Sequence, residues 1–234
     1  RANICILVIA DHSEEILLDD ASISDGRGDC IALIDLDSKA YAGKTQTQAI
    51  PALAKEAAKW SSAYAAVFAP YVTYILADDA AYNDNKVFPA SFHYLACAKR
   101  AFSSFAEWYA VAGYTRGVSS YVIDHTSVKL GEIAINALEP RNLVDDETRV
   151  QPAFACNVIA NFRGSYYLWG NRTAHKLGVA SGGNDLVASH FLNIRQLCTT
   201  IKKQLYVACR RFTFDPNSDA LWFNFVNAIT PTLD

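Results

Sequence analysis

Residues 30–36, with the sequence CIALIDL, form a short run that is apolar on both faces of an extended chain. Such runs are typical of interior strands in a sheet that helices cover on both sides. A helical stripe follows at residues 44–60 and contains Pro51, which a helix tolerates only in its first turn. β-favouring residues return at 64–75. Strand, helix and strand in this order predict a βαβ unit with parallel strands.

More elements are predicted before and after this unit. An apolar run at residues 4–9 predicts a further interior strand. Pro89 favours a helix that starts at Ala90 and extends to Ala112, because Gly113 is a typical C-terminal stop. Little can be predicted for residues 114–150, whose pattern is irregular.

A hairpin and a helical pair complete the predicted elements. Two β-favouring arms, residues 154–161 and 165–169, flank a tight Arg163-Gly164 turn. Beyond a glycine-rich loop at 178–183, apolar side chains recur every three or four positions from Phe191 to Phe212, which predicts an amphipathic helix. A second helix is predicted to start at an Asn217 or Ser218 cap and to stop before Pro231.

The sequence therefore predicts an α/β protein with a mixed, partly parallel sheet covered by helices and with a C-terminal helical pair. We divide it into an α/β core domain at residues 1–177 and a loop plus helical pair at residues 178–234. The other faces of the first helix of this pair carry basic side chains that either grip an acidic partner surface or are simply solvated. They are Arg195, Lys202, Lys203, Arg210 and Arg211.

Composition excludes several functions. The net charge of the 234 residues is −3, so no basic field is available to bind nucleic acid. No apolar run reaches the ~18 residues that span a bilayer, which argues against membrane insertion. The six cysteines lack any Cys-x-x-Cys pair and indicate buried thiols in a reducing compartment. The chain starts at Arg1 without a signal peptide, so we expect a fragment or a processed core.

No catalytic, cofactor or metal site is predicted. The chain lacks a Gly-x-Ser-x-Gly elbow, and the neighbouring residues of 11–13 and 124–126 (Asp-His-Ser and Asp-His-Thr) point apart. The five histidines show no His-Glu-x-x-His pattern, and the acidic residues at 78–84 lack the ligand order of a calcium loop. The glycines of 178–183 are not followed by the Lys-Ser or Lys-Thr of a phosphate-binding loop.

Three motifs resemble those of one family. Residues 167–174, YLWGNRTA, are similar to the Trp-Gly-x-[Arg or Lys]-Thr signature of contractile-tail sheath proteins, found in myophages, R-type bacteriocins and type VI secretion sheaths. Residues 191–197 and 212–217 look like the family's Ile-Asn-Val-Arg-Arg-Leu helix start and its Phe-Glu-Pro-Asn break, with Gln196 in place of an Arg. Looser likeness reaches back to about residue 30, and the Gly that the family has after Ser91 is missing.

The resemblance implies a non-enzymatic subunit of a myophage tail sheath, and we expect a giant phage as its source. Copies of such a subunit polymerise around the tail tube protein, connect to the baseplate, and contract to drive the tube through the host envelope during genome delivery. It would reside in the virion after assembly in the host cytoplasm, without a cofactor. The five basic residues above are its subunit-interface candidates.

Family members continue into terminal segments that exchange strands between subunits, whereas this chain ends at Asp234. We therefore expect this chain alone to be monomeric in solution. Two alternatives remain open: an α/β enzyme, hydrolase-like, which needs a nucleophile and a base ~3 Å apart in a pocket, and an α/β binding module, which would act as a monomer.

Overall fold

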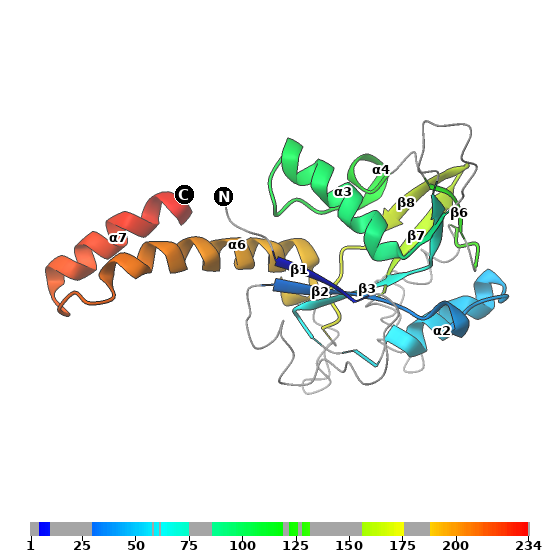
Figure 1. The fold of residues 1–234 in the computed structure, drawn as a ribbon, viewed down its shortest axis with the longest axis horizontal. Coiled ribbons are helices and arrows are strands. Elements are labelled where there is room, and N and C mark those ends of the chain that lie inside the picture. Colours follow the sequence, from blue (N-terminus) through cyan, green and yellow to red (C-terminus); the bar gives the residue numbers. More distant parts are fainter. Residues whose placement is uncertain are drawn as a thin grey trace.

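The computed structural model describes residues 5–9, 30–57, 59–60, 62–74, 86–118, 122–125, 128–131, 156–175 and 188–233. The described residues up to 191 form an α/β body, from which a pair of helices projects (Figure 1). We call residues 192–233 the arm. The predicted domain boundary between residues 177 and 178 lies outside the described residues.

The centre of the body is a five-stranded sheet with the order β1-β2-β3-β7-β8. Strands β1 (Cys5–Ile9), β2 (Cys30–Asp35), β3 (Ala65–Ala69) and β7 (Cys156–Phe162) pair in parallel, and β8 (Ser165–Trp169) runs antiparallel to β7. All side chains of β2 and β3 are buried, which explains why their sequences are apolar on both faces. The predicted α/β class, the mixed sheet and the βαβ unit are confirmed.

Helices cover both faces of this sheet. Figure 1 shows α3 (Ala90–Ser104) above the strands and α2 (Gln46–Ala57) below them. Because side chains alternate along a strand, Leu33 of β2 packs in the cluster under α3 while Ile34 packs in the cluster under α2. The body therefore has two buried apolar clusters, one on each side of the sheet.

The prediction of a single strand at residues 64–75 is wrong. The segment divides into β3 and β4 (Val72–Tyr74), with a cis Ala69–Pro70 peptide bond between them. Pro70 has no N–H group to donate to a ladder, so the chain leaves the central sheet there. Strand β4 instead pairs antiparallel with β5 (Lys86–Phe88) and β6 (Val122–His125) in a separate three-stranded sheet.

The predicted end of α3 at Ala112 is also wrong, because this helix ends at Ser104. The backbone leaves the helix at Phe105, and the rings of Phe105 and Tyr109 then pack on the guanidinium of Arg116, 5.9 and 5.6 Å from their centroids. Gly113 adopts a positive φ of 79° and starts the short helix α4 (Gly113–Arg116). This tertiary packing outweighs the helical propensity of the segment.

Two prolines lie deeper in helices than expected. Pro51 is in the second turn of α2, and α7 (Asp219–Leu233) continues through Pro231 instead of stopping before it. Proline removes the hydrogen bond to the carbonyl four residues earlier, here those of Thr47 and Asn227. Both of these residues are exposed, so water can reach this side of each helix.

The predicted hairpin is confirmed. Strands β7 and β8 pair from Val158↔Trp169 to Phe162↔Ser165, and Arg163 and Gly164 both have positive φ, 54° and 89°. This backbone geometry matches the right-handed twist of the flanking strands. Residues 154 and 155 of the predicted first arm, like the loop at 178–183, lie outside the described residues.

None of the helices that the structure describes has both the length and the hydropathy that a membrane crossing requires.

Candidate assembly surface

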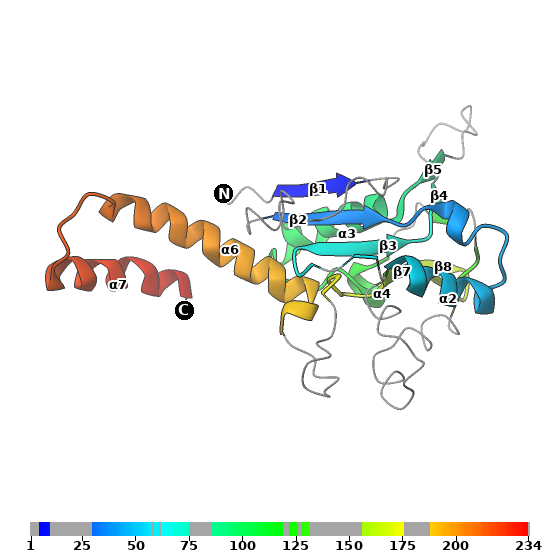
Figure 2. The same ribbon diagram turned by 90° about the horizontal axis from the view of Figure 1, so that it is seen from below.

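The arm is a helical hairpin that extends away from the body, as Figures 1 and 2 show from two directions. Helix α6 (Leu192–Cys209) is followed by a short 3₁₀ turn and then by α7, which returns alongside it. The predicted helical pair is therefore confirmed. Ser218 is the N-terminal cap of α7, because its hydroxyl oxygen accepts the Leu221 N–H at 3.2 Å.

Burial divides the arm into two parts. Its root, residues 192–200, packs on the body and buries the side chains of Leu192, Gln196, Thr199 and Thr200. In the projecting part, residues 201–231, no side chain is buried. Several large apolar side chains there are more than half exposed: Tyr206 68%, Val207 64%, Phe214 97%, Trp222 58%, Phe223 69% and Val226 52%.

The segment with the Trp-Gly-Asn-Arg-Thr sequence lies at the junction of body and arm. Asn157 of β7 holds it: the side-chain Oδ1 accepts the Arg172 N–H at 2.8 Å, and Nδ2 donates to the carbonyls of Arg172 and Val67. Gly170 lies so close that a Cβ atom would come within 2.7 Å of Asn157 Oδ1 and 2.8 Å of its Cα. Only glycine fits at this position.

The same segment also orients the start of α6. The Leu192 N–H donates to the Asn171 carbonyl at 3.1 Å, and Asn171 Nδ2 donates to Asn193 Oδ1 at 2.6 Å. Thr173 makes two hydrogen bonds to the 3₁₀ turn that precedes α6. Its N–H donates to the His190 carbonyl, and its hydroxyl donates to the Ser189 carbonyl. The signature residues therefore fix the direction in which the arm leaves the sheet.

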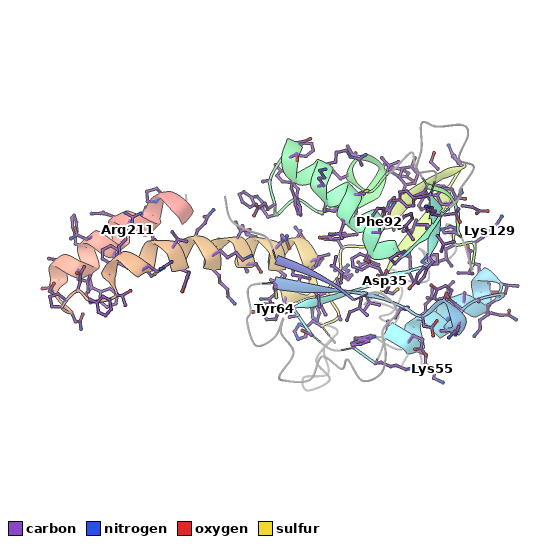
Figure 3. The ribbon with its side chains drawn as sticks, in the orientation of Figure 1. Asp35, Lys55, Tyr64, Phe92, Lys129 and Arg211 are labelled. Carbon is purple, nitrogen blue, oxygen red and sulfur yellow. The ribbon has the colours of Figure 1, made fainter. Side chains whose placement is uncertain are left out.

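A cation–aromatic stack secures the root further along α6. The guanidinium of Arg195 lies 4.4 Å from the ring centroid of Tyr64, and Lys202 Nζ donates to the Tyr64 hydroxyl at 2.9 Å. Thr200 donates its hydroxyl hydrogen to Glu107 at 3.0 Å. Figure 3 labels Tyr64, which lies just before β3, at the place where the arm meets the body.

The structure places the five predicted interface residues in different surroundings. Arg195 and Lys202 contact Tyr64 of the same chain, as described above. Lys203 is half-buried, whereas Arg210 and Arg211 are exposed at the end of α6, and Arg211 is labelled in Figure 3. Contacts of these residues with another subunit stay a prediction.

The body also holds two buried ionisable groups near the start of α3. The carboxylate of Asp35 accepts the Ser91 N–H at 2.8 Å and the Ser91 hydroxyl, and burial raises the pKa of Asp35 to about 6 although both bonds oppose the shift. His93 Nε2–H donates to the Gly117 carbonyl at 3.0 Å, and its Nδ1 accepts from Tyr74. Burial lowers the pKa of His93 to about 4. These fully paired groups join α3 to both sheets.

Among the residues that the structure describes, the geometry does not favour the hydrolase alternative. Asp124 accepts from the Tyr166 hydroxyl, while His125 Nε2–H donates to the Ile159 carbonyl, so the two side chains serve different partners. Cys97 lies 3.6 Å from His93, but burial raises the pKa of its thiol to about 11. Within the described part of the chain, no three His, Cys, Asp or Glu side chains could hold a metal.

One aromatic surface of the body was not foreseen from the sequence. Tyr114 of α4 is 61% exposed, and its ring centroid lies 4.9 Å from that of Tyr167 and 5.1 Å from that of Trp169. Alternation along β8 puts these two rings on one side of the hairpin, which is the only signal that the sequence holds. The rings of Tyr167 and Trp169 belong to β8, the last strand in the order of the central sheet, and Trp169 also packs against the buried cluster on the α2 side.

Similarity to known proteins is found among solved structures. No family model matches the chain, and no curated protein does. Among solved structures it is similar to a chain of an extracellular contractile injection system, the PVC sheath complex in the contracted state, with a TM-score of 0.61 and 19% identity over 88% of this chain and 48% of that one.

Two structures of the anti-feeding prophage (AFP) are similar as well. A chain of its baseplate gives a TM-score of 0.60 at 19% identity over 92% of this chain and 46% of that one. A chain of its helical sheath in the contracted state gives 0.57 at 20% identity over 87% and 45%. This chain thus has the fold of chains in contractile sheath structures, as its motifs indicated, and spans about half their length.

Proposed function

We propose that this chain is part of a contractile sheath subunit, a structural protein that polymerises and performs no catalysis. The observation that carries the proposal is the fold, shared over 88% of this chain with a chain of the PVC sheath complex and over 87% with a chain of the AFP helical sheath. The projecting part of the arm, which buries no side chain of its own, supports it because assembly would supply the missing contacts.

The construction of the molecule suits the mechanical task. Contraction needs subunits that move as rigid bodies between two packings of different free energy. The body supplies rigidity through its two buried clusters, and the Asn157 and Tyr64 contacts hold the arm at a fixed angle. In this proposal residues 1–177 form the core domain, and residues 178–234 begin the assembly region.

The finer proposal is a phage tail. The sheath would surround the tail tube protein, connect to the baseplate, and drive the tube through the host envelope to deliver the genome, without binding nucleic acid or inserting into a membrane. It would be part of the virion after assembly in the host cytoplasm. The Trp-Gly-Asn-Arg-Thr motif is consistent with this version, since it resembles a signature of myophage sheaths, but R-type bacteriocins and type VI secretion sheaths share that signature. Particles that carry this protein would then have DNA-filled heads, whereas headless particles would contradict the phage version alone.

Electron microscopy of the full-length polypeptide that contains this chain tests the proposal. Tubes or rings with helical striations are expected, because a sheath subunit repeats one contact around a tube. A polypeptide that stays monomeric at all concentrations, and that turns over a substrate until one side chain is replaced, would overturn the proposal in favour of the enzyme alternative.

A further inference from the structure

Two histidine rings lie face to face where the body meets the arm. We propose that this pair, His175 and His190, is a proton-sensitive latch, which holds the start of α6 against the body while both rings are neutral and releases it when the pair takes up a proton. The inference goes beyond the proposed function, because it concerns this chain alone and holds whether or not copies of the chain form a sheath.

The two rings come from segments that converge just before α6. His190 ends the 3₁₀ turn η5 (Ala188–His190), and His175 follows the Trp-Gly-Asn-Arg-Thr motif beyond β8. Their ring centroids are 4.7 Å apart, with an angle of 25° between the ring planes, so the rings are stacked. Neutral rings pack favourably at this separation, whereas positive charge on both rings would bring two like charges together.

The two rings differ in their access to water. His190 is only 1% exposed, so water cannot solvate a charge there. His175 is partly exposed, so a proton from solvent can reach it. His175 Nδ1 lies 2.8 Å from Ser189 Oγ, and a hydroxyl can either donate to the ring or accept from it. This bond therefore keeps a protonated His175 ring in the stack as long as the junction stays closed.

Basic groups lie beside the stack in the described part of the chain. Burial, and after it the charges of His190 and Arg195, lower the pKa of His175 below the usual value for histidine. The guanidinium of Arg172 is also close, because it lies 4.3 Å from the ring centroid of Phe191, the residue that follows His190. A proton on the closed stack is therefore opposed both by burial and by neighbouring positive charge.

Acid consequently favours the open junction. Once the rings separate, His175 recovers the usual histidine pKa of 6.5, so the open form binds more protons than the closed form. The latch is closed above pH 6.5 and opens progressively as the pH falls below this value. For one proton taken up, the equilibrium constant for opening rises by at most about tenfold per pH unit.

The latch acts at the point where the arm is attached. Thr173 joins the same two segments through hydrogen bonds to the Ser189 and His190 carbonyls, at 2.7 and 3.0 Å, so separation of the rings weakens both bonds. Helix α6 begins at Leu192, two residues after His190, and its first turn then loses this anchor. The Tyr64 contacts further along α6 remain. Acid should therefore loosen the angle of the arm without unfolding the body.

Amide hydrogen exchange of this chain at pH 7.5 and pH 5.5, corrected for the intrinsic effect of pH, tests the latch. The equilibrium constant for opening is calculated for peptides that cover residues 188–197 and, as an internal reference, for peptides that cover β3. We expect the constant at residues 188–197 to be about threefold to tenfold larger at pH 5.5. The constant for β3 should stay unchanged.

Two variants examine the role of each ring. His175→Gln cannot take up a proton, but its amide can still bond to Ser189, so opening at residues 188–197 should become independent of pH. His190→Phe keeps a flat apolar ring in the buried position and removes one of the basic groups that act on His175. Its response to pH should be smaller than that of the native chain but not zero, since Arg195 remains.

The matched control is His125→Gln. It replaces another buried histidine, in β6 at the end of the body that lies away from the arm (Figure 1), and glutamine can still donate to the Ile159 carbonyl. This variant should keep the native response to pH at residues 188–197. Loss of the response in His125→Gln as well would assign it to general destabilisation and would overturn the inference.

The remaining outcomes are equally decisive. Equal opening constants at the two pH values in the native chain, or a response that persists in His175→Gln, would contradict the latch. Faster exchange in β3 by the same factor would mean that acid loosens the whole chain, which would contradict it too. None of these results bears on the proposed function, which depends on whether the full-length polypeptide forms tubes.

Discussion

Every side chain of β2 and β3 in the body is buried, whereas no side chain is buried in residues 201–231 of the arm. Both regions are rich in apolar residues, so composition does not explain the difference. The body forms its own core, because helices cover both faces of its sheet. In the arm two helices contact each other, and several large apolar side chains stay exposed.

The largest expected effect separates the two regions directly. Phe68→Ala removes a fully buried ring that packs 5.1 Å from the Tyr94 ring, and it should lower the free energy of unfolding by about 3–5 kcal/mol. Phe223→Ala removes a ring that is 69% exposed and should change it by less than about 0.5 kcal/mol. Urea unfolding measures both. Equal losses would mean that the arm has a core of its own.

A second effect concerns pH and acts only on the body. The pKa of Asp35 is raised from 3.8 to about 6, so its protonated form favours the native state; this contribution is complete below pH 3.8 and is lost as pH rises through 6. The pKa of His93 is lowered from 6.5 to about 4, so stability is lost as pH falls through that range. Each amounts to about 3 kcal/mol at most, in opposite directions.

Stability of the native chain should therefore change little between pH 4 and 6.5. Asp35→Asn should become more stable as pH rises through this window, and His93→Gln should become less stable. Ser91→Ala removes a bond that lowers the pKa of Asp35, so the loss should extend to higher pH. Urea unfolding at several pH values measures how the free energy of unfolding of each variant changes with pH. The same pH dependence in all three variants would refute the assignment of these effects to Asp35 and His93.

A third, smaller effect concerns the junction between the two regions. Gly170→Ala puts a Cβ atom against the backbone of Asn157 and should cost about 1–3 kcal/mol. Gly131→Ala is the matched control, since its Cβ would meet Asn161 and Gln46 at 3.5 Å, an ordinary contact. Thermal unfolding compares the two variants. If both are equally stable, the close approach at Gly170 does not constrain the junction.

The smallest effect is confined to the root of the arm. Tyr64→Leu removes the ring that Arg195 and Lys202 contact, which should weaken the attachment by about 1 kcal/mol and speed amide exchange in α6 about fivefold. The control Tyr109→Leu removes a ring that packs on Arg116 within the body. Amide exchange in α6 of the Tyr109→Leu variant should equal that of the native chain. If exchange in α6 became faster in this control by as much as in Tyr64→Leu, a local role for Tyr64 would be contradicted.

Local signals in the sequence were sufficient for several elements. The Arg163-Gly164 turn predicted the hairpin, because a tight turn of this kind requires positive φ. The apolar run of β2 predicted an interior strand, and β2 lies between β1 and β3. The run at residues 4–9 predicted a strand correctly, but β1 is at the edge of the described sheet, so the prediction that it is interior was wrong. The amphipathic pattern and the Ser218 cap predicted the helical pair. In each case the information lies within a few residues.

The features that sequence reasoning missed depend on distant contacts. The end of α3 depends on Arg116, twelve positions beyond Ser104, and the Tyr64 partner of Lys202 lies 138 positions away. The Trp-Gly-Asn-Arg-Thr motif was recognised from the sequence, but its partner Asn157 was not. Asn157 lies in β7, and the apolar residues around it predict a strand without indicating that this side chain binds the motif. The basic residues of α6 were found as a pattern, without the ring that two of them contact.

Hydroxyl-radical footprinting of the full-length polypeptide, before and after assembly, tests the central claim that assembly covers the arm. Trp222 and Phe223, 58% and 69% exposed in the structure, should be labelled readily in the free protein and strongly protected in tubes, while Phe68 stays protected in both. Tubes in which Trp222 and Phe223 are labelled as readily as in the free protein would contradict the account.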